Sequence, residues 1–138
     1  MPSRTLLCVA ASLLGCGGSS GTQLSVGGTY ATAVMLLPGN TCGPVQVQDN
    51  PTVVTHIPGA GMLSLTHAGA TYSGSVMTSG AFSVPPTAVG GGVFTASISG
   101  QFNATGFTAT VHVAQSQPAC AYDVSWAGSK SGPPNVIP

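Results

Sequence analysis

Short polar and apolar runs, separated by turn residues, constrain the fold of this chain most strongly. From residue 28 onward the runs are rich in Thr, Val, Ser, Phe and Tyr, and clusters of Gly and Pro divide them. Runs of this length and composition are typical of β-strands, and helical spacing of apolar residues is almost absent. The short turns favour a meander, in which each strand pairs with the next. The sequence predicts one small all-β domain.

About eight segments show the strand pattern. They are residues 29–37, 52–57, 62–67, 71–77, 81–84, 93–102, 106–114 and 119–127, with 44–48 as a possible extra strand. Because side chains alternate between the two faces of a strand, each of the last three segments has one apolar face. We expect these residues to point inward: Cys120, Tyr122, Val124 and Trp126, then Phe94, Ala96, Ile98 and Phe102, then Phe107, Ala109, Val111 and Val113.

The chain carries very little charge. Charged residues make up 3% of it and the formal net charge is zero, whereas about 25% is usual in soluble domains. Arg4 and Lys130 are its only basic side chains apart from histidine. A protein that binds a phosphate backbone needs clustered basic residues. Nucleic acid is therefore excluded as a partner.

The N-terminus has the layout of an export signal. Arg4 precedes an apolar run over residues 6–14, and Gly15, Cys16 and a small polar stretch follow. This order is typical of a signal peptide. The run is about half the length of roughly 20 residues that a membrane-spanning helix needs. We therefore expect it to be removed on export.

The residues Leu13-Leu14-Gly15-Cys16 resemble the lipobox of bacterial lipoprotein precursors. The resemblance implies cleavage before Cys16, diacylglycerol on its thiol and an acyl chain such as palmitate on its amine. Several acyl chains would hold the protein stably on a membrane lipid surface. Gly17 stands where an Asp would resemble an inner-membrane retention signal, so the outer membrane, facing the periplasm or the outside, is expected. The alternative is an ordinary secretory signal cut near Ala11 or later, in which Cys16 has no role.

These signals divide the chain into four parts. Residues 1–15 are the expected signal peptide, and 16–27 a lipidated, flexible Gly/Ser-rich tether. Residues 28–130 are the expected β-barrel or sandwich, and 131–138 a Pro-rich tail. The mature chain would then begin at the acylated cysteine and contain one folded domain.

Two cysteines remain once the leader and the lipid are accounted for. Cys8 leaves with the signal peptide and Cys16 takes lipid, which leaves Cys42 and Cys120. Export makes a disulfide between them the expected state, while a metal site lacks the usual C-x-x-C spacing. Cys42 follows the first strand and Cys120 starts the last. A disulfide needs Cα atoms within roughly 7 Å, which favours a closed barrel or a tightly wrapped sandwich.

The same cysteines predict how the first and last strands align. If these strands pair in register with the disulfide, Leu36 lies opposite Trp126 and Val34 opposite Gly128. A bulge at residues 38–39 would shift this pairing by one or two positions. Neighbouring first and last strands are expected in either case.

Few side chains are suited to catalysis. The ionisable side chains of the domain, tyrosines aside, are Asp49, Asp123, Lys130, His56, His67 and His112. Asp49 lies in a turn motif, Asp123 faces outward on its strand, and the histidines are expected to be exposed or hydrogen-bonded. We therefore predict no enzyme activity, no catalytic residues, no metal and no cofactor.

A weak resemblance concerns the domain itself. Gly28-Thr29-Tyr30 is similar to the G-x-W start of lipocalin-type barrels, with Tyr30 in place of Trp, and Lys130 follows the last strand where that family often has a basic residue. The leading hypothesis is a non-catalytic binding or structural domain of the cell envelope. The alternative is a carrier of a small apolar ligand inside the barrel, and the third is an inhibitor of an envelope-attacking enzyme or a hydrolase. Seven aromatic residues are expected to fill the barrel, namely Tyr30, Tyr72, Tyr122, Trp126, Phe94, Phe102 and Phe107.

Overall fold

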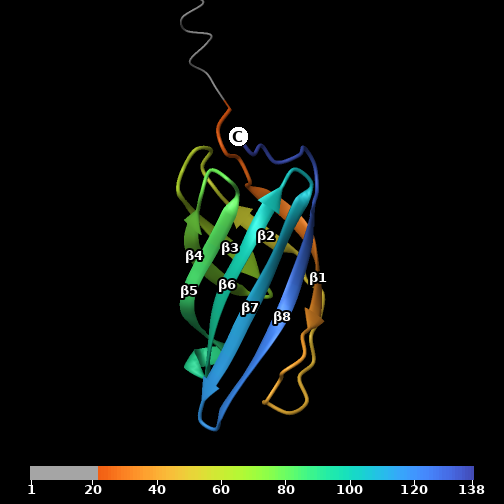
Figure 1. The fold of residues 1–138 in the computed structure, drawn as a ribbon, viewed down its shortest axis with the longest axis vertical. Helices are drawn as coiled ribbons and strands as arrows, with labels where there is room; N and C mark the ends of the chain where they lie inside the picture. Colours follow the sequence, from red (N-terminus) through yellow and green to blue (C-terminus); the bar gives the residue numbers. More distant parts are fainter. Residues whose placement is uncertain (1–21) are drawn as a thin grey trace, which may run out of the picture.

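A computed structural model describes residues 22–138, which form a closed antiparallel barrel (Figure 1). The expected signal peptide and Cys16 lie outside these residues. The strands are β1 (Gly28–Leu36), β2 (Thr52–Thr55), β3 (Met62–His67), β4 (Ala70–Val76), β5 (Ala81–Val89), β6 (Phe94–Asn103), β7 (Gly106–Ser116) and β8 (Ala119–Lys130), with a short 3-10 turn, η1 (Gly90–Gly92), before β6. Each strand pairs with the next, and β8 pairs with β1. The predicted all-β meander with a closed barrel is confirmed.

The register between β1 and β8 differs from the predicted one. Val34 lies opposite Trp126 and Leu36 opposite Val124, so the expected Leu36–Trp126 pairing is wrong by two residues. The cause is a bulge just after β1. Leu37 N–H donates to Asp123 O, whereas Thr41 N–H donates to Ala121 O, so two extra residues lie between these contacts. Pro38 and Gly39 lie in this segment, at the position where the sequence allows a bulge.

Several predicted strand bounds also need correction. The last strand is predicted at residues 119–127, but β8 continues to Lys130. The fifth is predicted at residues 81–84, but β5 continues past Pro85 and Pro86 to Val89 through a register shift between Val84 and Thr87. A bulge tolerates proline because the ladder is already interrupted there. Residues 44–48 form no strand, since they belong to the long loop between β1 and β2.

Both ends of the described chain close one end of the barrel (Figure 1). Leu24 and Val26 are buried, and Ser25 forms a bridge with Val136. Asn135 is buried as well, and the Tyr30 hydroxyl lies 2.8 Å from its Oδ1 and 2.5 Å from the Val26 carbonyl oxygen. Residues 24–27 and 135–137 are thus part of the folded domain. The folded part therefore begins before residue 28, where the expected tether ends. Within the expected tail, Asn135 is buried and Ile137 packs against the core, while residues 131–134 are exposed.

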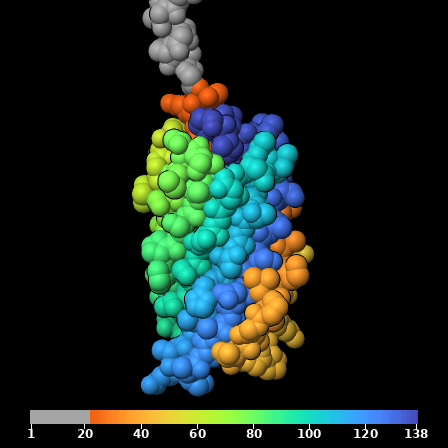
Figure 2. All heavy atoms as spheres, viewed as in Figure 1, coloured from red at the N-terminus to blue at the C-terminus, as the bar shows by residue number. Residues whose placement is uncertain are grey.

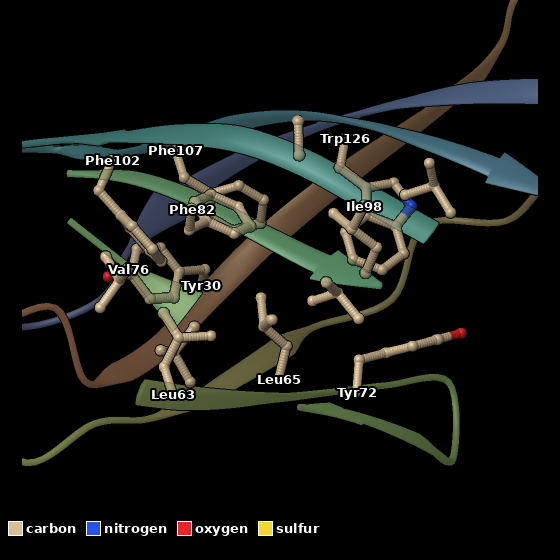
Figure 3. Close-up of a cluster of buried hydrophobic side chains, with 14 of the residues drawn as sticks. Tyr30, Leu63, Leu65, Tyr72, Val76, Phe82, Ile98, Phe102, Phe107 and Trp126 are labelled. Carbon is tan, nitrogen blue, oxygen red and sulfur yellow. The ribbon is translucent and has the colours of Figure 1, made fainter. Parts of the chain in front are cut away.

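Aromatic rings fill the barrel next to this closed end (Figure 3). The ring centroids of Phe82 and Phe102 are 4.6 Å apart, and those of Tyr30 and Phe107 are 5.2 Å apart. Glycine makes room for these rings on neighbouring strands. A Cβ added at Gly128 would lie 2.2 Å from the Phe107 ring, which sits directly opposite it on β7. The closed half of the barrel is therefore a tightly packed core.

The long loop of residues 37–51 is fastened to the last strand. Cys42 and Cys120 form a disulfide with a Cα–Cα distance of 5.0 Å. In the space-filling view the loop, in orange and gold, lies against the lower part of β8 (Figure 2). The predicted disulfide is present. It joins β8 to the loop after β1, while β1 itself is hydrogen-bonded to β8.

Candidate functional site: a cavity at the open end

Several inward side chains are small toward the end of the barrel opposite the described chain ends, although the partly buried Phe94 and Tyr122 also lie there. On β7 the inward series runs from Phe107 through Ala109 to Val111 and Val113. On β6 the inward Ile98 is followed, toward this end, by Ala96. An eight-stranded barrel is just wide enough for large side chains to fill. Small side chains at one level along the barrel axis therefore leave part of the interior unfilled.

That space is a cavity of about 340 Å³. Its walls come from β1, β3, β4 and β5 to β8, and from the loop of residues 37–51. The lining residues are Val34, Gln46, Val47, Gln48, Asn50, His67, Ala68, Tyr72, Val89, Gly90, Phe94, Ala96, Val111, Val113, Tyr122, Val124 and Trp126. The volume lies at the lower end of the roughly 300–1,000 Å³ range of small-molecule sites. The expectation that aromatic side chains fill the whole barrel is wrong for this end.

A stacked pair of rings lies between the packed core and the cavity. The centroids of His67 and Trp126 are 4.2 Å apart with 27° between the ring planes, and both residues are buried. The ring of Tyr72 meets Trp126 edge-on at 6.3 Å. In Figure 3 the Tyr72 hydroxyl points away from the aromatic core around Phe102. The cavity therefore has an aromatic floor with polar atoms near it.

Hydrogen bonds hold the His67 ring in place. Its Nδ1 lies 2.9 Å from Thr52 Oγ1, which in turn lies 2.7 Å from Thr32 Oγ1, and both threonines are buried. This chain of contacts crosses from β1 through β2 to β3 and occupies one ring nitrogen. Nε2 has no protein partner among residues 22–138, so it can bond to a molecule in the cavity. The hydrogen bond of His67 agrees with one of its two expected states, but its burial at a cavity was not predicted from the sequence.

The site is uncharged at neutral pH. Burial lowers the pKa of His67, so the neutral imidazole is favoured. Burial also raises the pKa of Tyr72, and the nearby Tyr122 raises it further. These shifts keep the imidazole and the Tyr72 hydroxyl neutral. The cavity thus offers hydrogen-bonding groups without an ionic partner.

The loop of residues 37–51 forms part of the cavity wall and is held at both ends. The disulfide at Cys42 fixes one end to β8. At the other end, Val34 N–H donates to Asp49 Oδ1 at 2.8 Å. β2 pairs with β1 only as far as Tyr30, so this carboxylate takes the place of a strand partner for β1. Asp49 therefore positions the loop.

The other singled-out histidines and carboxylate lie outside the cavity lining. His56 accepts a hydrogen bond from Val26 N–H and bonds to Ala60 O through Nε2, which fastens residues 24–27. His112 Nδ1 lies 2.7 Å from Asp123 Oδ1 on the outer wall, where the side chains are 53% and 40% exposed. Ser97 pairs with His112 from β6, but none of Ser97, His112 and Asp123 lines the cavity or the groove on the outer face of β6 to β8. Asp123 faces outward, as predicted.

Three shallower grooves lie elsewhere on the barrel. One, of about 410 Å³, runs along β1 and β8 beside Asp49, and is lined mostly by alanine, threonine and serine. A second crosses the outer face of β6 to β8, and a third lies beside the C-terminal segment. These grooves are lined mainly by small or polar residues, and each includes at most one aromatic residue, Trp126 in the second and Phe102 in the third, whereas Tyr72, Phe94, Tyr122 and Trp126 all line the open-end cavity. We therefore take the interior cavity as the candidate site.

Comparison with protein-family models, curated proteins and solved structures finds no match to this chain. No group of three or more His, Cys, Asp or Glu side chains within residues 22–138 is placed to hold a metal ion. In the same residues, no helix is both long and apolar enough to cross a membrane.

Proposed function

We propose that this protein is a non-catalytic binding protein of the cell envelope that takes a small, mainly apolar molecule into the open end of its barrel. The observation that carries this proposal is the contrast between the two halves of one interior. The half near the chain termini is packed with aromatic rings, whereas the other half holds a cavity of about 340 Å³ with Trp126 at its floor. This proposal combines the two hypotheses drawn from the sequence, namely a non-catalytic binding domain of the cell envelope and a carrier of a small apolar ligand.

A substitution that fills the cavity tests this function. Ala96 is buried and lines the cavity, so Ala96→Phe places a phenyl ring in the ligand space. Ala127 is exposed on the outer wall, and Ala127→Phe is the matched control. Binding of an apolar naphthalene dye should weaken at least tenfold in the first variant and stay unchanged in the second. Val113→Phe, from the same wall, provides a second filling variant.

The readout is the fluorescence of Trp126, which is the chain's single tryptophan. A dye bound beside it quenches its emission, so the signal reports occupancy of this end of the barrel. Thermal unfolding of each variant identifies any that fail to fold. Equal dye affinity in the native chain and in both filling variants would refute the proposed site.

We also propose that lipid on Cys16 anchors the protein, because the Leu13-Leu14-Gly15-Cys16 motif resembles a lipobox. The intact mass of the mature chain should correspond to cleavage before Cys16 plus acyl chains. Cys16→Ser should abolish the added mass and release the chain from the membrane fraction or leave it unprocessed. A mature chain that starts elsewhere without lipid would contradict this part.

A further inference from the structure

We propose that the cavity selects uncharged ligands and rejects ions of either sign. This inference rests on the proposed binding function and names the chemical class of the ligand. It follows from where the fold places its few charges and from the groups that face the cavity. A small ring compound with one or two hydrogen-bonding groups fits this description.

The charged side chains of residues 22–138 are not among those that line the cavity, although Asp49 lies in the loop wall between the lining residues Gln48 and Asn50. Asp49 Oδ1 accepts the Val34 N–H at 2.8 Å. Asp123 pairs with His112 on the outer wall at 2.7 Å. Lys130 lies at the closed end, with Nζ 6.0 Å from the centroid of the Tyr30 ring. None of these three lines the cavity. An ion that enters it would have no partner of opposite charge.

The groups that do face the cavity are neutral donors and acceptors. They are the imidazole of His67, the hydroxyls of Tyr72 and Tyr122, and the amides of Gln46, Gln48 and Asn50. The His67 imidazole is held uncharged because its burial disfavours the protonated form. Moving an ion from water into such surroundings carries a large desolvation cost unless it is paired. A neutral molecule loses only weaker hydration and gains apolar contact with Trp126.

The aromatic rings also suggest a competing class of ligand. Tryptophan and tyrosine rings attract cations through their faces, so a quaternary ammonium ion is the strongest alternative. One face of Trp126 is already covered by the parallel ring of His67 at 4.2 Å, and Tyr72 meets Trp126 at 67° with a centroid distance of 6.3 Å. The rings of His67, Tyr72 and Trp126 therefore contact one another. This arrangement favours the neutral class.

Two dyes with the same ring skeleton test the inference on the purified full chain. N-phenyl-1-naphthylamine is neutral, and 8-anilinonaphthalene-1-sulfonate adds one sulfonate to the same rings. Both are titrated against Trp126 fluorescence. A naphthylmethyl trimethylammonium ion, added as a competitor, represents cations. We expect the neutral dye to bind, the sulfonate to bind at least tenfold more weakly, and the ammonium ion to compete at least tenfold more weakly.

Two lysine variants show whether the discrimination arises in the cavity. Gln48 is exposed and lines the mouth, so Gln48→Lys adds a cation there. Ser99 is exposed on the outer wall, and Ser99→Lys adds the same charge at a distance. The first variant should bind the sulfonate at least threefold more tightly than the native chain. The second should leave its affinity unchanged.

The outcomes separate the two proposals. If either ion binds as tightly as the neutral dye, the selection of uncharged ligands is wrong while the binding function stands. If both lysine variants raise sulfonate affinity equally, the discrimination is not a property of the cavity and the inference is again overturned. If none of the three compounds binds, the proposed function itself fails and the inference fails with it.

Discussion

The disulfide between Cys42 and Cys120 should account for a large part of the stability of this barrel. It closes a loop with a sequence separation of 78 residues. In the chain-entropy model, a loop of this length removes about 15 cal/mol/K from the unfolded state, which is about 4.5 kcal/mol at 25 °C. A domain of roughly this size unfolds with an entropy near 0.25 kcal/mol/K. Loss of the disulfide should therefore lower Tm by about 15 to 20 °C.

The assay compares two chains that carry Cys8→Ser and Cys16→Ser, so that Cys42 and Cys120 are the only cysteines left. One keeps both and the other replaces both with serine. Thermal unfolding is followed by circular dichroism and by Trp126 fluorescence. Reducing agent should lower the Tm of the first chain to that of the second and leave the second unchanged. A difference below about 3 °C between the oxidised chain and the double serine variant would refute the entropy argument.

Other predictions concern single side chains. Burial raises the pKa of Tyr30 to about 12, and the unfolded value is near 10. The fold thus favours the protonated hydroxyl, so stability should fall by up to about 2 to 3 kcal/mol as the pH rises from 10 to 12. Urea unfolding should show a clearly smaller fall in Tyr30→Phe than in the native chain, because the raised pKa of Tyr72 remains in the variant, and equal losses would contradict the prediction. Gly128→Ala should destabilise the barrel by about 1 to 3 kcal/mol because the added methyl meets a ring across the strand pair. Gly61→Ala, whose Cβ meets its nearest atom at 3.9 Å, should be neutral or stabilising by up to about 1 kcal/mol, and equal effects in the two variants would argue against close packing. Asp123→Asn alters the exposed contact between Asp123 Oδ1 and His112 Nδ1 and should change the unfolding free energy by less than about 1 kcal/mol, so a larger loss would show that this contact is coupled to the core.

Alternation along the strands was enough to predict the barrel and its inner face. Trp126 and Val124 are buried as the pattern of β8 requires, because a period of two fixes which side chains share a face. The positions of Cys42 and Cys120 predicted that the first and last strands are neighbours, which is confirmed. These features depend on local chemistry and on one long-range covalent constraint, and both can be read directly in the sequence.

The features that the sequence did not predict depend on tertiary contacts. Leu24 and Val26 stand in a stretch rich in glycine and serine, and they are buried only because the barrel needs closing at that end. The spacing of two residues between Leu24 and Val26, which is typical of an extended segment with one buried face, was the signal in the sequence that could have predicted their burial. Phe94 and Tyr122 were expected to fill the interior, but they are only partly buried, at the cavity wall. An inward ring fills the barrel or borders a cavity according to its position along the barrel axis. The alternation of side chains shows only which face of the strand a residue occupies, so it does not predict this position.

The packing of residues 24–27 against the closed end of the barrel would set which way the cavity faces if lipid on Cys16 anchors the protein. Residues 24–27 are packed against that end, so an anchor at Cys16 would be joined to it by about eight residues, a reach of roughly 30 Å at most. Anchored in this way, the domain would have its closed end next to the lipid surface and its open end directed away from it. Ligand would then exchange with the aqueous space, or with a partner that approaches from it, and would not pass directly between the barrel and the bilayer that holds it.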